Sequence, residues 1–117
     1  MPAIKEKDLM YFENKLFLPM VIKVLEKDLE LINKLPFKFN RPYINKIENA
    51  LKLIRKDLKI AEIYLRRNDM KASKWEASEG STTYVFSSRG VEDHRKYLNT
   101  EIKTNCEELL YKYFTFN

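Results

Sequence analysis

The feature that most constrains the fold is a regular spacing of apolar residues across residues 42–68. Steps of three and four residues alternate along the whole segment. Side chains at this spacing share one side of an α-helix, and strict alternation is a heptad repeat whose seam faces a partner helix. We therefore expect one long helix with a seam that is a candidate self-association surface, formed by Ile44, Ile47, Leu51, Ile54, Leu58 and Leu65.

The composition favours further helices and one domain. Only two glycines and four prolines occur among 117 residues, whereas turn-rich all-β folds need more of both. The chain is 44% hydrophobic and 33% charged, which suits a buried core beneath a charged surface. We predict a single helical domain over residues 1–117.

Three other segments have helical spacing. Residues 19–34 and 91–114 each carry a broad apolar side, and residues 4–17 carry a shorter one. Pro19 separates two of these segments, and a kink or a new helix is expected there because proline lacks an N–H donor and clashes with the preceding turn. The segments predict a mainly α fold: an antiparallel three-helix bundle with a short N-terminal helix.

Residues 69–87 admit two interpretations. A small β-hairpin near 71–87, turning at Glu79-Gly80, would place Trp75 opposite Tyr84. Alternatively, the central helix extends through Ala77 and Gly80 lies just past its end. We favour the hairpin because the Thr-Thr-Tyr-Val-Phe run that starts at Thr82 has strong strand character and forms a poor helix.

The connection at residues 35–41 contains two aromatic residues, Phe37 and Phe39. We expect them to plug the end of the bundle, because aromatic side chains mostly serve packing. The alternative is an exposed aromatic docking site.

The positive charge of the chain is concentrated in one segment. The net charge is +5, and residues 41–74 hold ten basic and four acidic residues, a net charge of +6. Such localised charge attracts polyanions. The plainer interpretation is a solvated, lysine-rich helix face. The spacings Glu48–Lys52 and Glu62–Arg66 also suggest that ion pairs neutralise part of the positive charge. The candidate nucleic-acid-binding residues are Lys52, Lys56, Lys59, Arg66, Arg67, Lys71 and Lys74, with Trp75, Tyr84 and Phe86 as candidate stacking or docking residues.

The sequence lacks the residue patterns that a catalytic site or a metal site would need. Two isolated glycines cannot form a phosphate-cradling loop, and a single His and a single Cys cannot supply a structural zinc site. His94 is expected on the helix surface and Cys106 at the edge of the core. The sequence thus predicts a non-enzyme with no cofactor and no evident small-molecule substrate.

The same residues set the expectations for location and function. The sequence shows no secretory signal and no run long enough to cross a bilayer, so we expect no membrane partner and a cytoplasmic location. We expect a small non-catalytic accessory protein that acts by protein–protein contact or as a homodimer. The alternative is an electrostatic nucleic-acid-binding protein that uses the patch at residues 52–74.

Overall fold

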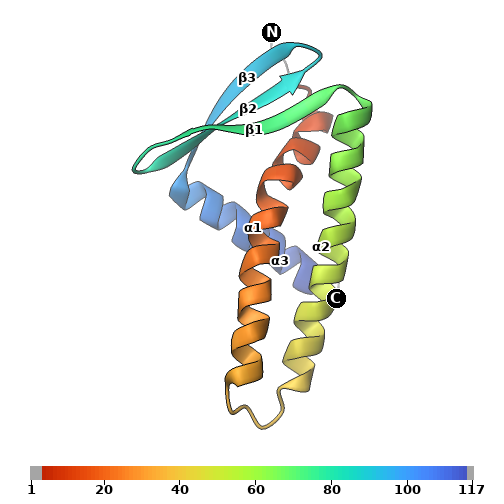
Figure 1. The fold of residues 1–117 in the computed structure, drawn as a ribbon, viewed down its shortest axis with the longest axis vertical. Coiled ribbons are helices and arrows are strands. Elements are labelled where there is room, and N and C mark those ends of the chain that lie inside the picture. The colour runs from red at the N-terminus through yellow and green to blue at the C-terminus, as the bar shows by residue number, and fades with distance from the viewer. Residues whose placement is uncertain (1–3, 116–117) are drawn as a thin grey trace.

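The computed structural model describes residues 4–115 and contains three helices and a three-stranded antiparallel sheet (Figure 1). The predicted three-helix bundle with a small hairpin is therefore wrong, because a helix-and-sheet arrangement takes its place. In chain order the elements are α1 (Glu6–Lys34), α2 (Arg41–Arg67), β1 (Met70–Ala77), β2 (Ser81–Ser88), β3 (Val91–Leu98) and α3 (Asn99–Thr115).

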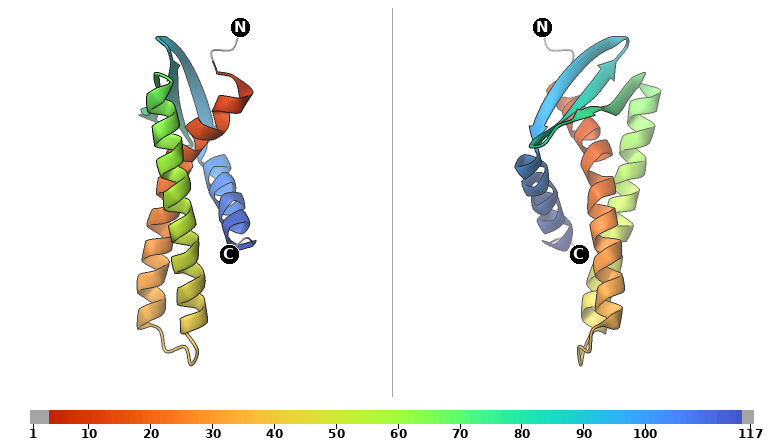
Figure 2. Two further views of the ribbon diagram at one scale, coloured as in Figure 1. Left: turned by 90° about the vertical axis from the view of Figure 1, so that its right-hand side faces the viewer. Right: turned by 60° about the vertical axis from the view of Figure 1, so that its left-hand side comes forward.

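The first two predicted helices form one helix, α1, which continues through Pro19. A proline inside a helix removes one backbone hydrogen bond, and α1 is visibly bent in its N-terminal half (Figure 2). The helix persists because Phe17, Leu18 and Val21, on both sides of the proline, are buried. The free energy gained by burying these side chains thus outweighs the tendency of proline to end the helix.

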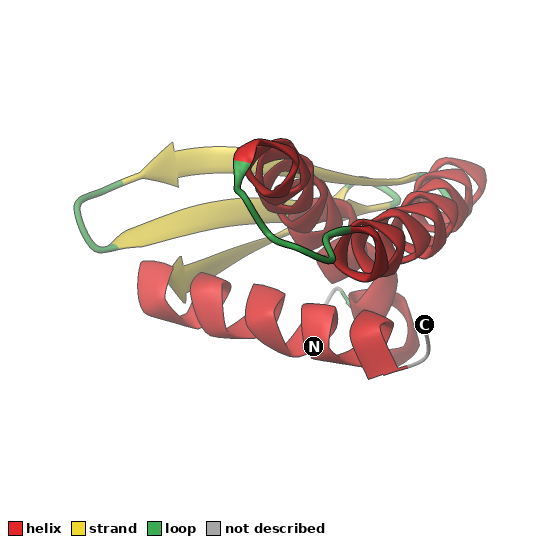
Figure 3. Ribbon diagram, turned by 90° about the horizontal axis from the view of Figure 1, so that it is seen from below, coloured by secondary structure: helices red, strands yellow, loops and turns green. Residues whose placement is uncertain are grey.

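Helices α1 and α2 form a long antiparallel hairpin that sets the 55 Å length of the molecule. Its core is a cluster in which Leu18, Val21 and Leu25 of α1 meet the seam of α2. Helix α3 lies against one side of this hairpin (Figures 2 and 3). None of its described side chains is fully buried, although Cys106 and Leu109 pack against the cluster.

The sheet has the order β1-β2-β3. The turn at Glu79-Gly80 joins β1 to β2, and Ala77 pairs with Thr82 as the hairpin interpretation requires. The alternative, a central helix extended through Ala77, is wrong. A bulge between Lys74 and Glu76 changes the register, so Lys74, and not Trp75, lies opposite Tyr84.

The third strand replaces the first two turns of the predicted last helix. Arg89 and Gly90 connect β2 to β3 as a two-residue loop, and their φ angles of +52° and +84° suit a hairpin turn. Strand β3 is held by pairing with β2 along its whole length. Tyr97 anchors it further, because its ring meets Phe17 of α1 edge-on.

One face of the sheet packs against the N-terminal half of α1. Phe86 is fully buried and stacks on Phe12, with 4.8 Å between ring centroids. Ile4, Leu65, Met70 and Tyr84 complete this second hydrophobic cluster. The outer surface of α2 and the other face of the sheet are left to form the molecular surface.

Candidate nucleic-acid interface

All seven predicted nucleic-acid-binding side chains are exposed; five lie on α2 and two on β1. We call this set, Lys52, Lys56, Lys59, Arg66, Arg67, Lys71 and Lys74, the basic surface. Within residues 4–115 none of the seven forms a hydrogen bond or an ion pair. Their charges are therefore available to an external anion.

The expected neutralisation by neighbouring glutamates does not occur. The carboxylate of Glu62 pairs with Lys15 of α1 at 2.5 Å, across the helix interface, and not with Arg66 on its own helix. Among the described residues no ion pair joins Glu48 to Lys52. Between described residues, the two ion pairs formed by α2, Lys15–Glu62 and Glu26–Arg55, both join it to α1. The side of α2 that faces away from α1 is therefore left cationic.

The helical and strand parts of the basic surface meet at a cleft. Arg66 from α2 and Lys71 from β1 both line this cleft, which has a volume of about 680 Å³. Its other charged walls are Lys15, Glu62 and Asp69. Glu62 is already paired with Lys15, so the remaining charged side chains of the cleft are Arg66, Lys71 and Asp69, which have a net charge of +1.

Trp75 is the exposed aromatic residue at the end of the basic surface. It sits at the bulge in β1, and 60% of its surface is accessible. Its ring meets that of His94 on β3 edge-on, with 4.9 Å between centroids. This contact places both rings on the face of the sheet that points away from Phe86, and it orients an indole that remains open to solvent.

The other two candidate stacking residues lie inside the protein. Phe86 is fully buried against Phe12. Tyr84 is buried in the same cluster, and burial raises the pKa of its phenol. A base could not reach either ring without opening the sheet, so the structure leaves Trp75 as the accessible member of the three.

The heptad seam of α2 faces inward. Ile47, Leu51, Ile54 and Leu65 are buried within the chain. Leu58 packs against the same cluster, and Ile44 is half-buried. The side chains proposed for self-association therefore already contact α1 and α3 of their own chain.

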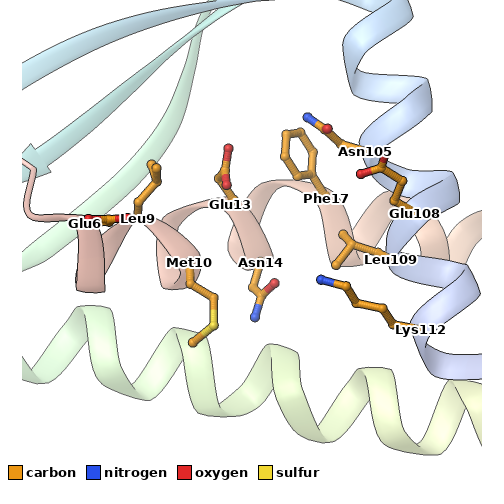
Figure 4. Close-up of a pocket in the computed structure, with 10 residues that line it drawn as sticks. All are labelled: Glu6, Leu9, Met10, Glu13, Asn14, Phe17, Asn105, Glu108, Leu109 and Lys112. Carbon is orange, nitrogen blue, oxygen red and sulfur yellow. The ribbon is translucent and has the colours of Figure 1, made fainter. Parts of the chain in front are cut away.

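A second cleft, of about 360 Å³, lies between α1 and α3 (Figure 4). Its charged walls are Glu6, Glu13, Glu108 and Lys112, and Glu13 accepts a hydrogen bond from Tyr97 at 3.0 Å. Three carboxylates against one ammonium group do not suit a phosphate. This cleft is therefore not part of the candidate interface.

The remaining candidate chemistry is sparse in the part of the chain that the structure describes. Cys106 is half-buried, and burial raises the pKa of its thiol, which disfavours the reactive thiolate. Residues 4–115 contain no group of three His, Cys, Asp or Glu side chains placed to hold a metal ion. No helix in this range combines the length and apolar character needed to cross a bilayer.

Comparison with known proteins gives a family relationship. Residues 3–117 match the family model described as YhjD protein. The chain is 34% identical over 113 residues to the uncharacterised protein YhjD of Bacillus subtilis (strain 168), which covers 97% of this chain and 94% of the relative. No solved structure matches the chain.

Proposed function

The chain belongs to the YhjD family, and we propose that it binds nucleic acid, with phosphates along the basic surface and a base on Trp75. The observation that carries this proposal is a group of seven exposed cations that have no acidic partner in the described part of the chain, together with the exposed indole of Trp75. Phosphate contacts by Lys and Arg supply most of the affinity in sequence-independent binding. Aromatic side chains add stacking that tolerates any base.

The dimensions of the basic surface suit a strand that runs along it. Lys52 and Arg66 are separated by fourteen residues of one helix, or about 21 Å at 1.5 Å per residue. Lys71 continues the charge onto the face of β1 that also carries Trp75, whereas Lys74 lies opposite Tyr84 and so belongs to the other face of the strand. A single strand following this path would pass several phosphates over cations before one base reaches the indole.

Trp75 favours a single strand over a duplex as the ligand. Stacking on a protein ring requires a base whose face is free, which paired bases inside a duplex do not offer. We therefore place single-stranded DNA or RNA ahead of duplex DNA.

Self-association through the heptad seam is the weaker proposal. It would require the seam, including the fully buried Ile54, to leave the core that it forms with α1. Binding along the basic surface requires no rearrangement. A protein partner with an acidic surface is the alternative ligand for the same cations.

The test is a titration followed by tryptophan fluorescence. Trp75 is the only tryptophan of the chain, so quenching by a single-stranded oligonucleotide reports on the site directly. Lys52→Glu with Lys59→Glu should weaken binding at least about tenfold, since two phosphate contacts become repulsive. The matched control is Lys23→Glu with Lys27→Glu, two exposed lysines four residues apart on α1.

The control variant carries the same change in net charge and should retain most of the affinity. Equal losses in both variants would show that net charge alone drives binding. Unchanged affinity in the Lys52/Lys59 variant would show that the basic surface is not the site.

A further inference from the structure

The helical hairpin ends, opposite the sheet, at the connection between α1 and α2 (Figure 1). Five large apolar side chains are exposed there: Leu31, Leu35, Phe37, Phe39 and Tyr43. We call this set the hairpin tip. The expectation that the two phenylalanines plug the end of a bundle is wrong, because Phe37 is 50% and Phe39 is 72% accessible.

Basic residues outnumber acidic ones around the hairpin tip, although Glu30 pairs with Lys34 at 3.4 Å and Asp28 lines the adjoining groove. Residues 31–47 contain four basic and no acidic residues, and the basic ones are Lys34, Lys38, Arg41 and Lys46. The ammonium of Lys38 lies 5.8 Å from the centre of the Phe39 ring, and the Phe37 and Tyr43 rings are 5.8 Å apart. The tip therefore combines clustered aromatic rings with positive charge.

We propose that the hairpin tip docks on an anionic lipid bilayer surface. Tyrosine prefers the boundary between headgroups and acyl chains, and phenylalanine and leucine bury their side chains at the same boundary in proteins that lie on a bilayer. Lys and Arg beside them are attracted by anionic headgroups and can extend toward the water. The tip supplies both kinds of side chain at the extreme end of a 55 Å molecule, so the rings can enter this boundary while the sheet and the basic surface stay outside.

The charge of the tip argues for lipid and against a second copy of the chain. A two-fold contact through the tip would bring identical surfaces together. Each surface carries Arg41, whose side chain has no acidic partner within residues 4–115 and whose nearest acidic residue in sequence is Glu48. Like charges placed together oppose association. An anionic bilayer is complementary to the same charge and also accepts the exposed rings.

An apolar groove beside the tip offers further room for a hydrocarbon group. It has a volume of about 550 Å³ and runs between the tip and the C-terminal end of α3, lined mainly by Leu31, Leu35, Phe37, Tyr43, Leu110 and Phe114. Asp28 and Lys46 are its charged wall residues. This inference concerns a surface at the other end of the molecule from Trp75, so it is independent of the proposed nucleic-acid binding.

The test is flotation with vesicles made of equal parts phosphatidylglycerol and phosphatidylcholine, compared with pure phosphatidylcholine vesicles. The protein should float with the anionic vesicles and not with the neutral ones. Phe37→Ser with Phe39→Ser should lower the bound fraction at least about tenfold, since two rings leave the lipid boundary. Tyr111→Ser, which removes a 76% accessible ring from α3, is the matched control and should bind normally.

Other results would overturn the proposal. One is the absence of binding to anionic vesicles, and another is equal binding by the Phe37/Phe39 variant. If Lys52→Glu with Lys59→Glu abolishes flotation while the Phe37/Phe39 variant floats, the lipid contacts the basic surface instead. A dimer in light scattering that Phe37→Ser with Phe39→Ser dissolves, together with no vesicle binding, would identify a second copy as the occupant.

A fluorescence measurement gives a second, independent readout. Trp75→Phe with Phe39→Trp moves the single tryptophan to the tip, and anionic vesicles should shift its emission to shorter wavelength because the indole leaves water. An emission maximum that does not move on vesicle binding would overturn insertion of the tip.

Discussion

The phenol of Tyr113 donates a hydrogen bond to the carboxylate of Asp57, with 2.6 Å between the two oxygen atoms, and so joins α3 to α2. Two other pairs repeat this chemistry. Tyr64 of α2 donates to Asp8 of α1, and Tyr97 of β3 donates to Glu13 of α1 at 3.0 Å. Two of the pairs therefore fix α3 and β3 against the helical hairpin, and the third joins the two helices of the hairpin to each other.

Replacing Tyr113 with Phe should destabilise the fold through Asp57. The substitution keeps the ring but leaves a half-buried carboxylate without its donor, at a cost of about 1–2 kcal/mol in the free energy of unfolding. Urea denaturation followed by circular dichroism measures this. Tyr111→Phe, on the exposed side of the same helix, should change the value by less than about 0.5 kcal/mol. Equal effects of the two substitutions would exclude a specific role for the bond.

Two half-buried tyrosines, Tyr97 and Tyr113, should make the fold sensitive to alkali. Burial, together with the neighbouring carboxylates, raises the pKa of Tyr97 and of Tyr113 well above the usual value. A raised pKa means that the fold favours the neutral phenol, so this stability is complete below about pH 10, the unfolded pKa, and declines as the pH rises further.

The phenolate absorbance against pH tests this prediction. In the native protein, part of the tyrosine signal should titrate later than in denaturant, and the free energy of unfolding should fall over the same alkaline range. A native titration that matches the denatured one would contradict it.

The conformation of the β2–β3 turn gives a prediction with an internal control. An added methyl group would have open space at both glycines of the chain, but Gly90 has a φ of +84° and Gly80 is outside the left-handed region. Gly90→Ala should therefore cost about 1–2 kcal/mol, whereas Gly80→Ala should be close to neutral. Thermal unfolding distinguishes them, and equal shifts would show that turn strain does not matter here.

Parts of the fold followed from local spacing. The central helix was predicted because its apolar residues are periodic, and the structure has a helix at Arg41–Arg67. The prediction of a helix at the position of β3 was wrong. Charged residues occur on both faces of this strand, so it lacks the apolar–polar alternation that indicates a strand. Its inner face includes Asp93 and Arg95, which pair at 3.0 Å, and Arg95 lies over Phe86. Such contacts exist only once the sheet is assembled.

The sequence predicted which residues make up the candidate site, but it did not predict which of their side chains are accessible. The sequence identified the basic residues, but the partner of Glu62 is Lys15, forty-seven positions away. The heptad spacing could not tell whether its partner helix belongs to the same chain. Likewise, the local sequence does not tell that Trp75 is exposed whereas Phe86 is buried, because the bulge in β1 determines the face of the sheet on which the indole lies. The Arg89-Gly90 pair was the available signal for the missed hairpin turn.

The salt dependence of binding should separate the two parts of the proposed interface. For a single strand, the logarithm of the affinity falls with the logarithm of the salt concentration, with a slope of about −0.7 per neutralised phosphate. Six contacts, from the residues of the basic surface other than Lys74, would give a slope of about −4. Lys52→Gln with Lys59→Gln should make the slope shallower by about 1.4, because two counterions fewer are released.

Trp75→Leu should behave differently, because stacking releases no counterions. The loss of one base contact should weaken oligonucleotide binding by about 1–3 kcal/mol at every salt concentration and leave the slope unchanged. Heparin, a polyanion without bases, should bind the wild type and the Trp75→Leu variant equally, as measured by anisotropy of a labelled ligand. If Trp75→Leu weakens heparin as much as the oligonucleotide, the indole supports the shape of the site and does not stack on a base. If neither ligand binds the wild type, the basic surface is only a solvated face of α2 and β1.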